Sequence, residues 1–198
     1  MAILFAAPHS PFDPAGSLNA DLIPCQVQAL KSAGCCGAFV AGSTGEWPSL
    51  TVAERLELTE AWADAILSSE LRLIVHVGHH CLDDAKQLAT ACNDLDAVGG
   101  IAALAPSFFK PHGVNGILDW CSEISSAAPD KPFFYYHIPP LTGVGEDMEL
   151  LGDRTIWGGI GGLVTSMGLA QWSHLASLCA ALFTCIFMCI RIIQIVKK

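Results

Sequence analysis

Two short stretches of the 198-residue sequence place hydroxyl groups where an apolar run ends. In AGSTGE, residues 41–46, Ser43 and Thr44 stand between Gly42 and Gly45, whose lack of side chains lets backbone N–H groups approach a ligand closely. Such a group of donors would suit a carboxylate. A tight turn between a strand and a helix, with the hydroxyls bonded only locally, is the alternative, and five residues alone leave both open.

The second stretch is FYYHIPPLTGV, residues 134–144, where Tyr136 comes near the end of an apolar run that two prolines then stop. Its phenol could carry a proton in acid–base chemistry. An aromatic core residue whose hydroxyl finds a backbone partner is the alternative. In a (β/α)8 barrel both stretches would reach the C-terminal face, where such barrels keep their active sites.

These stretches belong to a series of six apolar runs with helical sequence between them. The runs are continuous rather than alternating, which is typical of parallel strands covered on both faces. They recur about every 30 residues, as the units of a (β/α)8 barrel do, although a doubly wound sheet would also hold six strands. No Gly-x-Gly-x-x-Gly motif opens a helix after any run. The runs cover residues 2–7, 37–42, 71–78, 99–109, 132–138 and 158–166.

The clearest predicted helix follows the second run, over residues 51–66. Thr51 and Glu54 have the spacing of a capping box at its start. The residues that recur at spacings of four and three, and are expected to pack inward, are Val52, Leu56, Thr59, Ala63 and Ile66.

Composition and charge narrow the class of protein. Hydrophobic residues make up 52% and charged residues 15%, which argues against disorder. The formal charge of -9 disfavours nucleic acid as a partner. Nine cysteines without a Cys-x-x-Cys pair favour a reducing compartment, and the chain opens with no secretory leader, so we expect a cytoplasmic protein.

The remaining histidines and cysteines give weaker signals. His76, His79, His80 and Cys81 could be imagined as metal ligands, but neighbours at a strand end point apart, so we expect solvent-facing or turn histidines and no metal. Cys35 and Cys36, which follow Gly34, are expected to be structural. Cys185 and Cys189, four residues apart, fall on one helical face without a histidine partner.

The sequence changes character from Leu175 onward. Residues 175–190 carry no charge, and Arg191, a short apolar run and two lysines follow. We expect an apolar C-terminal helix over residues 175–198 behind a domain of residues 1–174. Contact with a membrane is expected only through residues 175–196, which are borderline in length for a spanning helix.

The order of GSTGE, then Tyr136, then HIPPLTGV resembles the dihydrodipicolinate synthase and N-acetylneuraminate lyase family of class I aldolases. The resemblance covers roughly residues 2 to 175. YHIPPLTGV, HVGHH from His76 and APSFFKP from Ala105 are similar to the lyase branch of that family.

The resemblance implies a TIM barrel that cleaves N-acetylneuraminate to N-acetylmannosamine and pyruvate without a cofactor. A lysine on the sixth strand forms a Schiff base with the substrate ketone. Ser43, Thr44 and Thr165 would bind the substrate and Tyr136 would move the proton of its hydroxyl. Family members assemble as homotetramers, so we expect this chain to form a homotetramer as well.

The sequence departs from the family at the lysine, because GGLVTSM places Val164 at that position. Valine cannot form an imine. Lys131 precedes the fifth run, at the opposite end of a barrel. Lys110 follows the fourth run on the correct side, but the relatives carry a lysine there in addition to the catalytic one. We therefore expect little or no lyase activity.

Two further departures concern substrate binding. The chain supplies about six β/α units, and the family's sugar-binding strands seven and eight are replaced by the apolar tail. Phe108 and Phe109 stand in the region where bacterial relatives carry a tyrosine that reaches a neighbouring subunit.

Three interpretations remain open. The first is an altered or truncated lyase-family chain. The second is a non-catalytic or regulatory subunit that keeps the carboxylate site and binds an α-keto acid. The third is a barrel remnant anchored by its tail to a membrane.

Overall fold

Five parallel strands form the sheet that the apolar runs predict. The computed structural model of the chain describes residues 4–144 and 191–194. The strands lie side by side in chain order, as in half of a (β/α)8 barrel, so the predicted fold class is confirmed as a parallel half-barrel. Their bounds are β1 Phe5–Ala6, β2 Gly37–Val40, β3 Arg72–His76, β4 Val98–Ala103 and β5 Phe133–His137.

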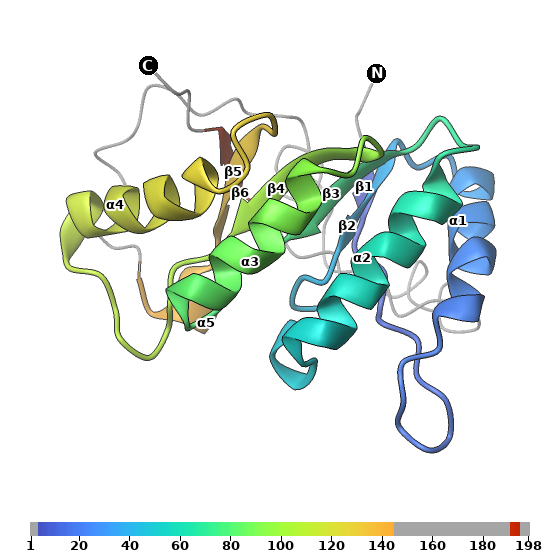
Figure 1. The fold of residues 1–198 in the computed structure, drawn as a ribbon, viewed down its shortest axis with the longest axis horizontal. Coiled ribbons are helices and arrows are strands. Elements are labelled where there is room, and N and C mark those ends of the chain that lie inside the picture. Colours follow the sequence, from blue (N-terminus) through green and yellow to red (C-terminus); the bar gives the residue numbers. More distant parts are fainter. Residues whose placement is uncertain (1–3, 145–190, 195–198) are drawn as a thin grey trace, which may run out of the picture.

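Four helices connect the strands and cover one face of the sheet. Each packs against the next, so that they succeed one another across that face in chain order (Figure 1). Short helical turns, Ala20–Leu22 and Trp47–Ser49, precede α1 and α2, and α5 follows β5. The bounds are α1 Ile23–Ser32, α2 Val52–Ile66, α3 Leu82–Asn93, α4 Gly113–Ser126 and α5 Pro139–Thr142.

The sheet has an apolar layer on each face, because alternate residues of a strand point to opposite sides. One layer lies between strands and helices. On the other face a smaller group, which we call the inner cluster, lines what would be the barrel interior. Its members are Phe39, Trp47, Ile74, Ala102, Leu104, Tyr136 and Ile138.

Helix α2 begins at the predicted capping box. Thr51 Oγ1 accepts a hydrogen bond from the Glu54 N–H at 3.2 Å, and Glu54 Oε2 accepts one from the Thr51 N–H at 2.8 Å. These two bonds satisfy donors at the helix start. The buried face includes Thr59 but also Arg55, which the sequence reading left out.

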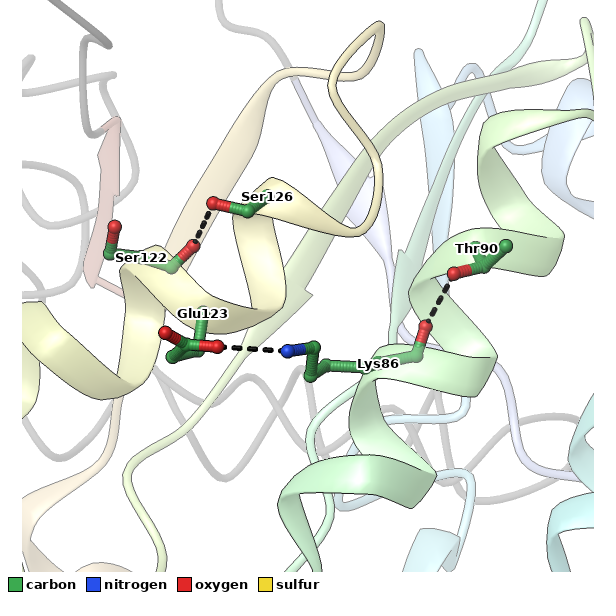
Figure 2. A network of polar contacts seen from close by, with 5 residues as sticks. All are labelled: Lys86, Thr90, Ser122, Glu123 and Ser126. Carbon is green, nitrogen blue, oxygen red and sulfur yellow. Dashed lines mark hydrogen bonds and ion pairs between the residues drawn. The ribbon is translucent and has the colours of Figure 1, made fainter.

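A polar contact joins α3 to α4 on the outside of the helical layer (Figure 2). Lys86 Nζ lies 2.8 Å from Glu123 Oε2. On each helix a hydroxyl, that of Thr90 or Ser126, bonds the carbonyl one turn back. Because the ion pair is exposed, its contribution to stability is small.

The sixth strand of the sheet is not the one that the sequence predicts. Residues Arg191–Gln194 form β6, which pairs antiparallel with β5 from Phe134↔Gln194 to His137↔Arg191. We expected a parallel strand from residues 158–166, and a helix over 175–198; within that tail, Arg191–Gln194 are strand instead. The physical reason is that β5 has an open edge, which any extended segment can pair with.

The rest of the predicted tail, and residues 158–166 with it, lie outside the described residues. Over the described part of the chain, no helix combines the length and apolar character needed to cross a membrane.

Candidate active site at the strand ends

Tyr136 and Ser43 meet at the C-terminal ends of the strands. The Tyr136 hydroxyl donates to Ser43 Oγ at 3.4 Å, although β3 and β4 lie between their strands in the sheet. Neighbouring strands are about 4.8 Å apart, so only a curved sheet brings these two side chains into contact. The two stretches singled out in the sequence therefore share one site.

The Tyr136 phenol is held in its protonated form. Its side chain is 3% exposed and packs against Phe39, with ring centroids 4.9 Å apart. Burial raises the pKa of Tyr136 above its ordinary value, and the contact with Ser43 opposes that rise only in part. At neutral pH the hydroxyl is thus a hydrogen-bond donor that faces the half-buried Ser43.

The stretch Gly42–Glu46, which we call the GSTGE turn, folds back on itself. Ser43 O accepts from the Glu46 N–H at 3.1 Å, and Gly42 O accepts from the Trp47 N–H at 3.4 Å. A Cβ on Gly45 would lie 3.1 Å from the backbone of Ala41, which explains the need for glycine there. Thr44 is half-buried like Ser43.

Two non-glycine residues, one just before the turn and one at its end, adopt the left-handed region of backbone space. Ala41 has a φ of 53° and Glu46 a φ of 55°. Such angles cost free energy for residues with a Cβ and persist only where neighbours hold them. Ser10 helps to hold this backbone conformation, because its buried hydroxyl donates a hydrogen bond to Gly45 O at 2.6 Å.

A buried histidine and arginine lie beneath the turn. His76 Nδ1 is 2.9 Å from Ala41 O, and since a carbonyl only accepts, Nδ1 carries the proton. Arg55 donates to the backbone carbonyls of Gly78 and His76, at 2.9 and 2.5 Å. Both side chains are 1% exposed.

Burial also sets the charges of this pair. It lowers the pKa of His76 well below 6.5, and the Arg55 charge lowers it further, so His76 is neutral. Burial lowers the pKa of Arg55 to about 10, which still leaves the guanidinium charged at neutral pH. Within residues 4–144 and 191–194, no carboxylate forms an ion pair with it.

The expectation of solvent-facing or turn histidines was therefore wrong for His76. The reason is that β3 is covered on both faces, so its inward side chains are enclosed. The other two lie around Trp47: His79 is half-buried beside Asp84, and His80 is exposed. Among the described residues, no three His, Cys, Asp or Glu side chains gather as metal ligands would.

The two lysines considered as nucleophiles lie at opposite ends of the sheet, as predicted. Lys131 Nζ donates to Leu95 O at 2.8 Å, before β4 and β5 begin. Lys110 follows β4 on the side of Tyr136, and its Nζ packs against Gly143 at the end of α5.

The other sequence candidates are exposed, half-buried or outside the described residues. Phe108 and Phe109 are 79% and 83% exposed. Cys35 and Cys36 are half-buried rather than fully buried, because they lie between α1 and β2, and not within either. Outside the described residues are Val164, Thr165, Cys185 and Cys189.

Comparison with known proteins identifies related chains. Residues 1–170 match the family described as the Dihydrodipicolinate synthetase family. The chain is 39% identical over 151 residues to N-acetylneuraminate lyase B of Xenopus laevis, which covers 75% of this chain and 56% of that one. It is also 39% identical to N-acetylneuraminate lyase of Homo sapiens, covering 76% and 47%.

Solved structures of N-acetylneuraminate lyases are also similar to this chain. The N-acetylneuraminate lyase of Proteus mirabilis aligns with a TM-score of 0.71 at 36% identity, over 76% of this chain and 50% of that one. The sialic acid aldolase of Aliivibrio salmonicida aligns with a TM-score of 0.70 at 36% identity, over 73% and 47%. The chain thus spans about half the length of the relatives it matches.

Proposed function

The chain belongs to the dihydrodipicolinate synthetase family, and from that premise we propose that it carries the α-keto-acid half of an N-acetylneuraminate-lyase-type site. The observation that carries the proposal is the contact of Tyr136 Oη with Ser43 Oγ at 3.4 Å. It joins a hydroxyl-lined turn to a protonated phenol at one end of a half-barrel, where barrel enzymes keep their sites.

In this proposal each described residue has a separate task. Ser43 and Thr44, with the N–H groups of the turn, hold the carboxylate of pyruvate or of a larger α-keto acid. Tyr136 donates a proton to a substrate oxygen or takes one back. These groups would orient a ketone for attack by an amine.

The chain has no lysine amine at the sequence position where the family carries its Schiff-base lysine. Schiff-base aldolases need a lysine whose imine accepts the electrons of the carbon–carbon bond. Val164 stands at that position of the sequence, and a valine side chain has no nucleophile. We therefore propose that the chain binds α-keto acids without covalent attachment and has little or no lyase turnover.

The alternative within this proposal is regulatory. A chain that keeps the carboxylate site but not the amine would act as a non-catalytic partner of an intact lyase, within the homotetramer expected for the family. Co-purification with a full-length lyase, and a change in that lyase's turnover on mixing, would favour this role.

The first experiment tests binding. Saturation-transfer NMR with pyruvate alone should detect bound ligand on the full chain. The signal should fall in Ser43→Ala and persist in Ser126→Ala, an exposed serine of α4 whose hydroxyl bonds its own helix. Equal signals in both variants, or no signal in the unmodified chain, would show that the turn is not a carboxylate site.

The second experiment tests the covalent step. Incubation with pyruvate and borohydride should leave the mass of the unmodified chain unchanged, whereas Val164→Lys should gain a pyruvyl adduct. Val164→Met, which is similar in length but has no amine, is the matched control. An adduct on the unmodified chain, mapped to Lys110 or another lysine, would show that the nucleophile is misplaced.

A further inference from the structure

We propose that Arg55 and His76 are positioning residues that hold the GSTGE turn in its carboxylate-binding shape. Ligand affinity would then depend on two buried side chains of α2 and β3 that act through the backbone of the turn. The inference rests on the proposed function, because it names residues that shape the same site.

The first step is the strained residue that enters the turn. Ala41 has a φ of 53°, an angle that an alanine keeps only when its surroundings impose it. Its carbonyl oxygen is held by His76 Nδ1 at 2.9 Å. Ala41 immediately precedes Gly42, so releasing this oxygen would let the backbone rotate where the turn begins.

The second step is the fixed orientation of the His76 ring. Tyr136 and Trp47 lie against it, with ring centroids 5.6 and 5.4 Å away. Gly78 leaves room for the ring, since a Cβ there would lie 2.7 Å from His76 Nε2. These contacts restrict the ring to an orientation in which Nδ1 faces Ala41 O and the ring packs roughly perpendicular to Tyr136.

The third step is the buried charge of Arg55. Its guanidinium bonds backbone carbonyls at the end of β3 and lies 5.5 Å from the Trp47 ring centroid. A buried cation is costly unless an anion or dipoles compensate it. Two backbone carbonyls and the Trp47 ring compensate this charge in part, and no described carboxylate pairs with it, so positive charge remains beneath the turn and would favour an anionic ligand.

The competing explanation is that both residues merely stabilise the sheet. The two ring nitrogens of His76 separate these explanations, because asparagine places an amide N–H near Nδ1 and glutamine places one near Nε2. His76→Asn should keep the bond to Ala41 O, and His76→Gln should lose it. Thr59→Val is the control for buried polar changes in α2, where its hydroxyl bonds the Arg55 carbonyl.

The experiment is an NMR titration of the full-length variants with pyruvate. We expect a Kd within about threefold of the unmodified chain for His76→Asn and Thr59→Val, and at least about tenfold higher for His76→Gln and Arg55→Met. If the glutamine variant binds as tightly as the asparagine variant, His76 does not position the turn. If Arg55→Met binds as the unmodified chain does, its charge plays no part.

A second measurement does not depend on ligand. Hydrogen exchange of the Glu46 and Trp47 amides, which bond carbonyls inside the turn, reports its order directly. Faster exchange in His76→Gln and Arg55→Met than in the other two variants supports the inference even if pyruvate does not bind, an outcome that would refute only the proposed function. Equal exchange in all variants would overturn the inference.

Discussion

Adding one methyl group at Gly78 should disrupt the support beneath the turn. A Cβ at this position would lie 2.7 Å from His76 Nε2, 3.1 Å from His76 Cε1 and 3.2 Å from the Leu104 amide nitrogen. The imidazole cannot retreat freely, because aromatic rings pack against it. Gly78→Ala should therefore displace the ring and break its bond to Ala41 O.

The expected loss of stability follows from three contributions. Forcing extra volume into a packed site costs about 1–3 kcal/mol. A buried carbonyl left without its donor costs about 1–3 kcal/mol more. Alanine lowers the conformational entropy of the unfolded chain relative to glycine, which stabilises the folded state by about 0.4–1 kcal/mol. The free energy of unfolding should thus fall by about 1–6 kcal/mol, the range these three contributions span.

Gly99 offers a matched control in the next strand. A Cβ there would meet only Leu73 O, at an ordinary 3.4 Å, so Gly99→Ala should be neutral or slightly stabilising. Urea denaturation of both variants measures the difference, and the His76 ring resonances report whether the imidazole moved. Equal stability of the two variants, or unchanged His76 resonances in Gly78→Ala, would refute the reasoning.

Three further outcomes are expected. The pKa of His76 in the folded chain lies well below 6.5, so near pH 6.5 only the unfolded chain binds a proton at this side chain. Acidification therefore favours unfolding. Between pH 7.5 and 5.5 the free energy of unfolding, measured by urea denaturation, should fall less in His76→Asn than in the unmodified chain. Burial raises the pKa of Cys92 and of Cys121 to about 12, so maleimide should label them only after unfolding, which mass spectrometry will detect. Among the cysteines of the described residues, the exposed Cys25 and Cys81 should react in the folded chain. Lys86→Met should leave the urea midpoint unchanged, because both partners of the pair with Glu123 are exposed; a clear shift would show that this contact matters more than its exposure suggests.

The strands could be predicted because a parallel sheet covered on both faces demands continuous apolar runs. The same reasoning predicts that His76 is buried, although the cluster of His76, His79 and His80 suggested solvent-facing or turn histidines. In the run Leu71–Gly78, alternate residues face opposite sides, so a histidine between Val75 and Val77 must point to the inner face. Burial of that side chain was readable from its register in the strand.

Arg55 was missed for a different reason. Charged residues on a helix are mostly exposed, and the predicted inward face ran through Val52 and Leu56, which are only half-buried. The buried face keeps the predicted Thr59, Ala63 and Ile66, but is turned away from Val52 and Leu56. Arg55, Thr59, Trp62 and Ile66 follow each other at spacings of four, three and four, which is also a helical stripe.

The pairing of β5 with β6 could not be read from local pattern at all. A short segment such as Arg191–Gln194 contains β-branched residues that favour a strand, but its sequence does not indicate which strand it pairs with. The edge it takes depends on which strands are already paired, which is a property of the whole sheet. The domain boundary at residue 174 and the homotetramer remain predictions.

The antiparallel pairing of β6 has a consequence for the order in which the chain assembles. Strands β1 to β5 are each joined to the next by one local crossover, whereas the contact of His137 with Arg191 must wait for the ends of the segment 138–190 to meet. Longer loops cost more entropy to close and slow the contacts that depend on them. We therefore expect the outer edge of β5 to be paired last during folding. In that interval it presents unpaired N–H and C=O groups to other chains, so molecules newly made at high concentration are most exposed to strand-to-strand association at this edge.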